Sequence, residues 1–243
     1  MSPTEATAKV PTLRERRRAV ATQEILGAAE RHIVENGPHA LSLRAVARDL
    51  GMTVQALYHY FASRDDLVTA LITKAYEDLA DAVLAAVDRA HEDPSVPRLV
   101  HAAEGYRRWA IAHPERFQLI YGSPLRGYAA PPGGPTTRAL QRMSGIFQRE
   151  LFAGFTTEQL AAADMPGPSP ELIAHLGQLS PSGLGVLPPA GVHLLLRAWG
   201  HMHGLVVLEV FGHTSFMGGH QAEVFRVSMS HLVQDVHRRI PTA

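Results

Sequence analysis

The chain has 243 residues, a formal net charge of +0 and no cysteine. The lack of cysteine excludes disulfides, thiolate catalysis and Cys-ligated metal sites, and it fits a cytoplasmic protein. The composition, 46% hydrophobic and 19% charged, is that of a soluble globular protein, and no stretch approaches the roughly 18 consecutive apolar residues of a membrane span.

The N-terminal part of the chain is more basic than the rest. Residues 1–64 hold nine Lys and Arg against six Asp and Glu, so the remaining residues carry the balancing excess of acid. A basic end on an acidic body suits a protein of which one end meets phosphates. Residues 1–12 are polar and are expected to form a flexible tail. The basic run of residues 14–18 is either a DNA-contacting arm or a solvated start.

Helical periodicity runs through almost the whole chain and predicts an all-α fold. A first helix is expected over residues 14–36, where a Gly-Pro pair ends it. A second helix begins at Ser42, which has N-cap chemistry. Gly51 then supplies a left-handed turn residue, and Thr53 caps a third helix over residues 54–60.

Two short helices joined by a Gly-containing turn of three residues have the geometry of a helix-turn-helix. The expected core consists of apolar residues at helical spacing: Leu43, Val46, Ala47, Leu50, Leu57 and Phe61. The exposed side chains offer hydrogen-bonding groups, flat rings and charge suited to DNA: Thr53, Gln55, Tyr58, His59, Tyr60, Arg44 and Arg64. In such a unit phosphate contacts position the helix, while side chains at its N-terminus meet base edges.

The rest of the chain alternates helices with Pro- and Gly-rich breaks. A capping pattern at Ser63 opens a long helix that ends near Ala90. Further helices are expected over residues 97–113, 114–121, 136–153, 190–211 and 221–239. The predicted organisation is a tail over residues 1–12, a helix-turn-helix domain over 13–65 and a helical domain over 66–243.

Residues 40–67, ALSLRAVARDLGMTVQALYHYFASRDDL, resemble the DNA-binding domain of the tetracycline-repressor (TetR) family. The resemblance covers roughly residues 14–70. Residues 57–61 match the family's Leu-Tyr-x-His/Tyr-Phe, and residues 63–67 match its Ser/Asn-Lys-x-x-Leu. Arg64 replaces the common Lys, which keeps a cation but changes its donor geometry. Gln55 and Ala56 stand where Gly or Thr is frequent, so the operator sequence stays open.

The resemblance implies roles for particular side chains. Arg44 corresponds to a residue that approaches bases or phosphates from the second helix. The base-facing start of the recognition helix corresponds to Thr53, Val54, Gln55 and Ala56. The phosphate-contacting positions correspond to Tyr58, His59 and Arg64. A half-buried core position for Tyr58 and solvated positions for the two arginines are the alternatives.

The resemblance also implies that the C-terminal helices dimerise and bind an effector. Residues 198–209, AWGHMHGLVVLE, resemble the Trp/His-Gly (WHG) signature of one regulatory subgroup. Glycines four apart let another helix approach closely, and with the final helix they predict an intersubunit four-helix bundle. The candidate interface residues are Gly200, Gly204, Leu208 and Val233. Packing within one subunit is the alternative.

Aromatic and apolar residues of the central helices are candidates for lining an effector cavity: Tyr106, Trp109, Phe117, Tyr121, Met143, Phe147 and Leu151. Ordinary core packing is the alternative for each. The spacings among His193, His201, His203 and His213 do not build an i, i+4 pair, so no metal site is expected. The chain has no catalytic motif or phosphate-binding loop, and neither enzyme activity nor a cofactor is expected.

Together with these patterns, the resemblance implies a ligand-responsive transcriptional repressor. It would bind a palindromic double-stranded DNA operator as a homodimer, with recognition helices about 34 to 36 Å apart in successive major grooves. A small-molecule effector would release it by pivoting the helix over residues 66–90. The alternatives are a TetR-like regulator that activates or acts without a ligand and, more remotely, an all-α adaptor or enzyme.

Overall fold

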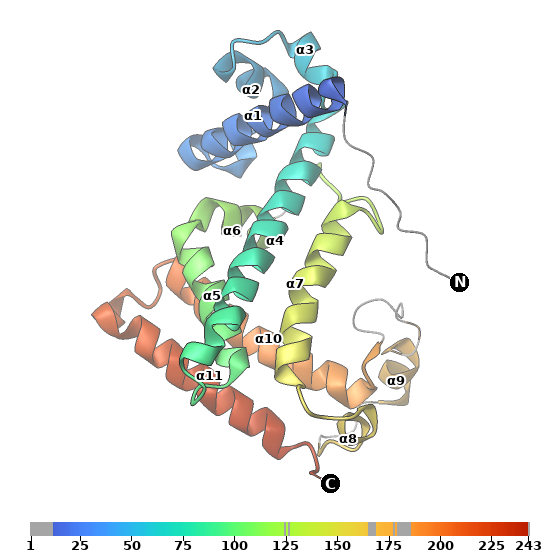
Figure 1. Ribbon diagram of the computed structural model, residues 1–243, viewed down its shortest axis with the longest axis vertical. Coiled ribbons are helices and arrows are strands. Elements are labelled where there is room, and N and C mark those ends of the chain that lie inside the picture. The colour runs from blue at the N-terminus through green and yellow to red at the C-terminus, as the bar shows by residue number, and fades with distance from the viewer. Residues whose placement is uncertain are drawn as a thin grey trace.

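The computed structural model describes residues 12–123, 125, 127–164, 169–176, 178 and 186–242. Within these residues all regular structure is helical, which confirms the predicted all-α fold. The expected tail lies outside the described residues except for Thr12. Figure 1 shows α1, α2 and α3 gathered at one end of the molecule, with α4 leading from them into a larger helical body.

Helix α1 (Leu13–Asn36) begins at a capping box. The Thr12 hydroxyl accepts a hydrogen bond from the backbone of Glu15 at 3.2 Å, and the Glu15 carboxylate accepts one from the Thr12 backbone at 2.6 Å. These bonds satisfy backbone donors that a helix start otherwise leaves free. The basic run of residues 14–18 is therefore the helical start of α1 rather than an extended arm.

Helices α2 (Leu43–Asp49) and α3 (Val54–Tyr58) form the predicted helix-turn-helix. The Ser42 hydroxyl caps α2 and the Thr53 hydroxyl caps α3, each by accepting a bond from the backbone three residues on. Gly51, between the two helices, has a φ of +64°, a conformation that other residues rarely adopt. Helix α3 ends two residues earlier than the sequence predicted.

Helix α4 (Arg64–Asp88) belongs to two hydrophobic cores. Its first turns contribute Leu67, Val68 and Leu71 to the N-terminal core, which also holds buried residues of α1, α2 and α3. From Ala75 onward its apolar side chains pack into the core of the body. The chain thus passes from one core to the other inside a continuous helix, between Leu71 and Ala75.

The body is built around α4, with α5 and α7 packed along it and α10 and α11 crossing its far end (Figure 1). Its other helices are α5 (Arg98–Ala112), α6 (Pro114–Tyr121), α7 (Pro135–Leu151), α8 (Thr157–Ala161), α9 (Pro170–Leu176), α10 (Pro189–Val210) and α11 (Gln221–Arg238). Short 3-10 turns precede α2, α5 and α11: η1 (Pro38–Ala40), η2 (Arg89–Glu92) and η4 (Ser215–His220). The sequence reading omitted α8 and α9, which are too short to show a period. None of the described helices is long and apolar enough to cross a membrane.

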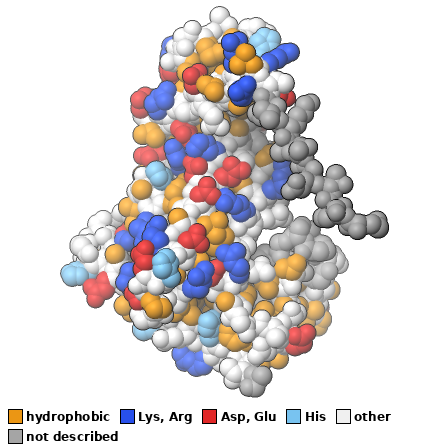
Figure 2. All heavy atoms as spheres, in the orientation of Figure 1, with side chains coloured by type: hydrophobic (Ala, Val, Ile, Leu, Met, Phe, Trp, Pro, Cys, Tyr) orange, Lys and Arg blue, Asp and Glu red, His pale blue; other side chains and the backbone are white. Residues whose placement is uncertain are grey.

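Four charged side chains join the N-terminal unit to the body. Arg116 of α6 lies 3.0 Å from Glu30 of α1 and 3.2 Å from Asp78 of α4. Lys74 of α4 lies 3.3 Å from Glu30 and 2.6 Å from Asp78. Burial lowers the pKa of Lys74, but the hydrogen bond to Asp78 and the two carboxylates outweigh it and raise the pKa above its ordinary value. Figure 2 shows acidic and basic side chains interspersed along the visible face of the molecule.

Helices α4 and α5 pack closely at Gly105. A Cβ atom at this position would stand 2.7 Å from the Cβ of Ala86 and 3.2 Å from the Cα of Val83. Neither neighbour has a flexible end that could move away. The spacing of the two central helices therefore depends on the missing side chain of Gly105.

We expect Gly105→Ala to lower the free energy of unfolding by about 1–3 kcal/mol, because the added methyl group overpacks this contact. The matched control is Gly145→Ala on α7, where no described atom lies within 4 Å of the added Cβ. Its stability should rise by about 0.5–1 kcal/mol, since Ala is the better helix former. Urea unfolding followed by circular dichroism measures both, and equal shifts of one sign would contradict the tight contact.

Candidate nucleic-acid interface and core cavity

Helix α3, the recognition helix, is buried on the side that packs against α2 and exposed to solvent on the other side. Val46 of α2 and Leu57 of α3 are fully buried and pack the two helices together. Gln55, Tyr58 and His59 lie on the exposed side, and Tyr58 has 45% of its surface accessible. The unit therefore presents an amide, a phenol and an imidazole on one surface.

The remaining predicted contact residues surround this surface in different ways. Arg44 is exposed on α2, and Val54 and Ala56 are half-buried at the start of α3. Thr53 is exposed, although its hydroxyl is engaged in capping the helix. Arg64 is held in place, because its Nε donates a hydrogen bond of 3.0 Å to the backbone oxygen of Leu41.

A basic groove adjoins the recognition helix where α1 begins. It is lined by Leu13, Arg14, Arg17, Arg18, His59 and Tyr60. The Arg18 guanidinium donates a hydrogen bond of 3.0 Å to the His59 backbone and lies 5.5 Å from the ring centre of Tyr60. The sequence did not predict the contact of Arg18 with His59 and Tyr60, although residues 14, 17 and 18 share one face of a helix. The groove places cations beside the rings of His59 and Tyr60, which directly follow α3.

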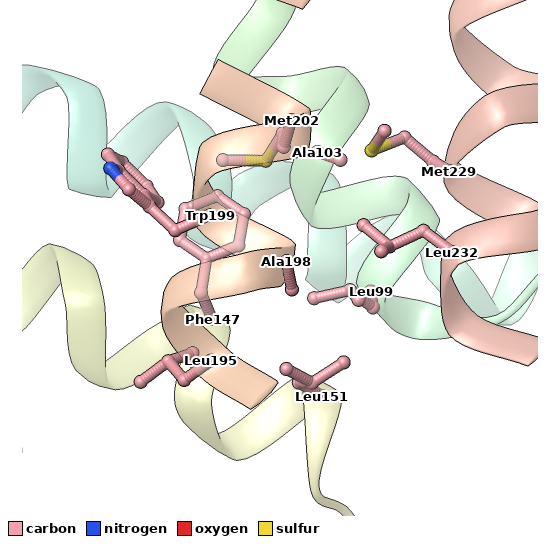
Figure 3. Close-up of a pocket in the computed structure, with 10 residues that line it drawn as sticks. All are labelled: Leu99, Ala103, Phe147, Leu151, Leu195, Ala198, Trp199, Met202, Met229 and Leu232. Atoms are coloured by element: carbon pink, nitrogen blue, oxygen red, sulfur yellow. The ribbon is translucent and has the colours of Figure 1, made fainter. Parts of the chain in front are cut away.

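The body contains a small apolar cavity between α5, α7, α10 and α11 (Figure 3). Its volume is about 20 Å³, and its lining consists of Leu99, Ala103, Phe147, Leu151, Leu195, Ala198, Trp199, Met202, Met229 and Leu232. Among the described residues, no charged side chain lines it. Met202 and Met229 approach it from α10 and α11, and such flexible side chains adapt readily to a change in shape.

An aromatic cluster shares a wall with this cavity. Its members come from five helices: Tyr76, Tyr106, Phe117, Tyr121, Phe147, Trp199 and His203. Phe147 and Trp199 belong to both the cluster and the cavity lining, and their ring centres are 5.7 Å apart. The His203 ring stacks on Trp199 with an interplanar angle of 10°. We refer to these seven residues as the aromatic cluster.

The polar groups of the aromatic cluster have unequal surroundings. A hydrogen bond of 2.7 Å joins the Tyr106 hydroxyl to Nδ1 of His203, and the Tyr76 hydroxyl donates a long bond of 3.5 Å to the Ile120 backbone. Burial lowers the pKa of His203, which favours its neutral form at pH 7, and raises the pKa of Tyr76 to about 12. The Tyr121 hydroxyl is buried without a hydrogen-bond partner among the described residues.

Helices α10 and α11 also present an outward face. Beyond the backbone of their own helix, Gly200 and Gly204 have no described atom within 4 Å of an added Cβ, so no other described segment of the same chain packs closely on them. The face continues in exposed apolar side chains of the two helices: Leu196, Leu208, Phe211, Val224 and Val227. Arg197 and Asp235 join the helices by an ion pair of 2.8 Å.

Val233 does not belong to this face. It is only 4% exposed and packs in the core of its own chain with Phe225, Met229 and Val236. Helix α11 carries apolar residues on both an inward and an outward side, and the sequence pattern alone does not distinguish them. The assignment of Val233 to the interface is therefore corrected.

Two family models match the chain. One, described as bacterial regulatory proteins of the tetR family, matches residues 25–71. The other, described as a tetracyclin repressor-like C-terminal domain, matches residues 99–232, which is more than half of the chain. The chain belongs to the tetracycline-repressor family. This family consists of helix-turn-helix transcriptional regulators, and the matched N-terminal model covers α2 and α3.

Individual proteins and solved structures are also similar to this chain. The HTH-type transcriptional regulator Rv1816 of Mycobacterium tuberculosis is 40% identical over 147 residues, which are 60% of this chain and 62% of that protein. The match thus spans less than two thirds of that relative. The solved regulatory protein SCO4313 is 32% identical with a TM-score of 0.71, covering 92% of this chain and 100% of that chain. A solved tetR family transcription regulator from Shewanella sp. PV-4 shares the fold at 17% identity and a TM-score of 0.55, covering 86% and 96%.

The structure brings together only some of the residues predicted for an effector cavity of this TetR-family body. Phe147 and Leu151 line the cavity, and Tyr106, Phe117 and Tyr121 belong to the aromatic cluster. Trp109 and Met143 are buried elsewhere in the core and line neither.

The sequence reading missed three members of the aromatic cluster: Tyr76, Trp199 and His203. Trp199 and His203 are four residues apart, a spacing that places them on one face of α10. That spacing was the available signal, but the helix was assigned to the dimer interface alone. The described residues contain no group of three or more His, Cys, Asp or Glu placed to hold a metal ion.

We expect Gln55→Ala to relax the preference of the TetR-family regulator at one base pair of each operator half-site. An exposed amide near the start of a recognition helix can bond bidentately to adenine, which is worth about 1–3 kcal/mol of discrimination. Binding to a set of single-base operator variants, measured by fluorescence anisotropy, tests this. An equal loss of affinity for every variant would reject the role.

Tyr58→Phe is the matched comparison on the same exposed surface. Its exposed hydroxyl is the predicted phosphate contact, so its removal should weaken operator and unrelated DNA by the same factor and leave the base preference unchanged. Thermal unfolding should be unaffected because the ring is retained.

Proposed function

We propose that this TetR-family regulator is a repressor that binds a palindromic operator as a homodimer and leaves it when a small molecule occupies the body. One observation carries the proposal: helix α6 contacts the DNA-binding unit and the aromatic cluster at the same time. Arg116 of α6 pairs with Glu30 of α1, while Phe117 and Tyr121 of α6 lie among the aromatic rings.

This arrangement supports a coupling between the two sites. Leu119 of α6 is also part of the N-terminal core, so a displacement of α6 strains that core as well as the ion pairs. A ligand that fits the aromatic cluster only after α6 has moved would favour a different position of the DNA-binding unit. Repression and release would follow if only the ligand-free arrangement fits the operator.

The outward face of α10 and α11 supports a homodimer. Exposed apolar side chains flank Gly200 and Gly204, where a second helix can approach the backbone closely. A two-fold dimer formed there would contain a four-helix bundle of α10 and α11 from each subunit. Two recognition helices can then read half-sites one DNA turn, about 34 to 36 Å, apart.

The arrangement of α10 also supports the Trp/His-Gly type of C-terminal domain. Trp199 and His203 face the aromatic cluster, while Gly200 and Gly204 lie on the outward side. In this assignment the aromatic residues of the signature belong to the ligand site, and its glycines belong to the dimer interface.

A mobility-shift assay combined with transcription in vitro tests the proposed function. The protein should shift DNA from upstream of its own gene in the presence of excess heparin, which removes non-specific binding. Transcription from that DNA should fall as protein is added. A rise in transcription would instead identify an activator, and the absence of a selective shift would favour an adaptor.

We expect Gly204→Leu to dissociate the dimer. The added side chain costs about 1–3 kcal/mol at a close helix contact, and no described atom of the same chain stands within 4 Å of the added Cβ. Sedimentation should show a monomer at concentrations where the wild type is a dimer, with operator binding lost and helical content kept.

Gly145→Leu is the control, because α7 offers the same open space at a position away from α10 and α11. This variant should remain dimeric and bind the operator. A Gly204→Leu protein that stays fully dimeric would remove the outward face from the interface.

A further inference from the structure

The Tyr121 hydroxyl, together with the Thr214 hydroxyl and Nε of Arg239, is a buried side-chain group that has no hydrogen-bond partner among the described residues. It is buried and makes no hydrogen bond of normal geometry with any described residue, although the hydroxyls of Tyr76 and Tyr106 lie near enough to affect its pKa. Those two hydroxyls have their own partners in the Ile120 backbone and in His203. A buried group without a partner destabilises the fold, so its presence points to a partner that the chain itself does not supply.

The surroundings of this hydroxyl suit a flat, apolar molecule. The ring centre of Tyr121 lies 4.6 Å from that of His203, 5.2 Å from that of Phe117 and 6.1 Å from that of Trp199. Aromatic rings prefer such stacked or tilted neighbours at these separations. Beyond Trp199 and Phe147 lies the apolar cavity of Figure 3, whose volume is only about 20 Å³, so an aliphatic extension enters it only by displacing side chains that line it.

The charges of the region favour an uncharged ligand. Among the described residues, no Lys, Arg, Asp or Glu lines the cavity or belongs to the aromatic cluster. Burial lowers the pKa of His203, which favours its neutral form, and its Nδ1 is engaged by Tyr106. Arg107 and Glu209, which lie on the helices that carry these two residues, neutralise each other in a two-bond ion pair. A carboxylate or an ammonium group would be buried here without a counter-ion, which is costly.

We propose that the body binds an uncharged, hydrophobic molecule with one hydrogen-bonding group, and that this group bonds to the Tyr121 hydroxyl while the apolar part fills the cavity. The ligand joins the two spaces by displacing the ring of Phe147 or Trp199. This proposal rests on the ligand response proposed above and names the ligand class and its polar anchor.

Three probes share a benzene ring and a butyl tail and differ only in a hydroxyl, a hydrogen or a carboxylate: 4-butylphenol, butylbenzene and 4-butylbenzoate. They separate the effect of the hydrogen-bonding group from the effect of charge. Isothermal titration calorimetry on the full-length protein measures their affinities. Butylphenol should bind about tenfold more tightly than butylbenzene, the factor expected for one buried hydrogen bond. Butylbenzoate should bind more weakly than either, because its carboxylate has no counter-ion in the site.

Tyr121→Phe provides the decisive comparison. It should weaken butylphenol about tenfold and leave butylbenzene unchanged, so that the two probes bind alike. The melting temperature of the free variant should rise by about 2–4 °C, because an unsatisfied hydroxyl has been removed. Tyr128→Phe is the control, since its hydroxyl pairs with Thr69 outside the aromatic cluster, and butylphenol should bind this variant as it binds the wild type.

The proposal is overturned if no probe binds, if butylbenzoate binds best, or if Tyr121→Phe leaves the butylphenol affinity unchanged. A lower melting temperature together with unchanged affinities would show that a bound water satisfies the hydroxyl. Operator release by butylphenol is measured separately by anisotropy. If butylphenol binding depends on Tyr121 but butylphenol does not release the operator, Tyr121 is the polar anchor and the protein is not a ligand-responsive repressor. If butylphenol releases the operator equally from the wild type and from Tyr121→Phe, the protein is a ligand-responsive repressor and Tyr121 is not the anchor.

Discussion

The architecture depends on helix α4, which cannot move without disturbing two hydrophobic cores. Its early turns are buried against α1 and α3, and its later turns are buried against α5 and α7. The charges of Glu30, Lys74, Asp78 and Arg116 reinforce this constraint, because partly buried ions must stay paired. A movement of α4 or α6 in the body is therefore transmitted to α1 in the N-terminal unit.

Two helices serve two purposes each because a helix presents different faces at a period of 3.6 residues. Helix α6 turns Arg116 toward the DNA-binding unit and Phe117 and Tyr121 toward the aromatic cluster. Helix α10 turns Trp199 and His203 inward and leaves Gly200 and Gly204 facing outward. In the proposed function these faces connect the ligand to the DNA and the ligand site to the dimer.

The recognition helix is too short to be stable alone, since isolated helices below about 12 residues are marginal in water. Its order comes from its surroundings. The Thr53 cap closes its start, Leu57 anchors it in the N-terminal core, and Arg18 holds the chain at His59 just beyond its end. Arg64 ties the beginning of α4 to the segment before α2. These contacts fix the surface that carries Gln55 and Tyr58 before any DNA is bound.

The sequence alone determined the longer helices and the helix-turn-helix, though not the short helices α8 and α9, because caps, turn glycines and apolar spacing act over a few residues. Ser42, Gly51, Thr53 and Ser63 each occupied the predicted local position. Only the tertiary structure decided which apolar side chains point inward. Val233 belongs to the core of its own chain, Trp109 and Met143 lie apart from the cavity, and His203 meets Tyr106, a partner 97 residues away. Local periodicity gives each helix its faces, but the neighbour that each face meets is set by the packing of segments far apart in the chain.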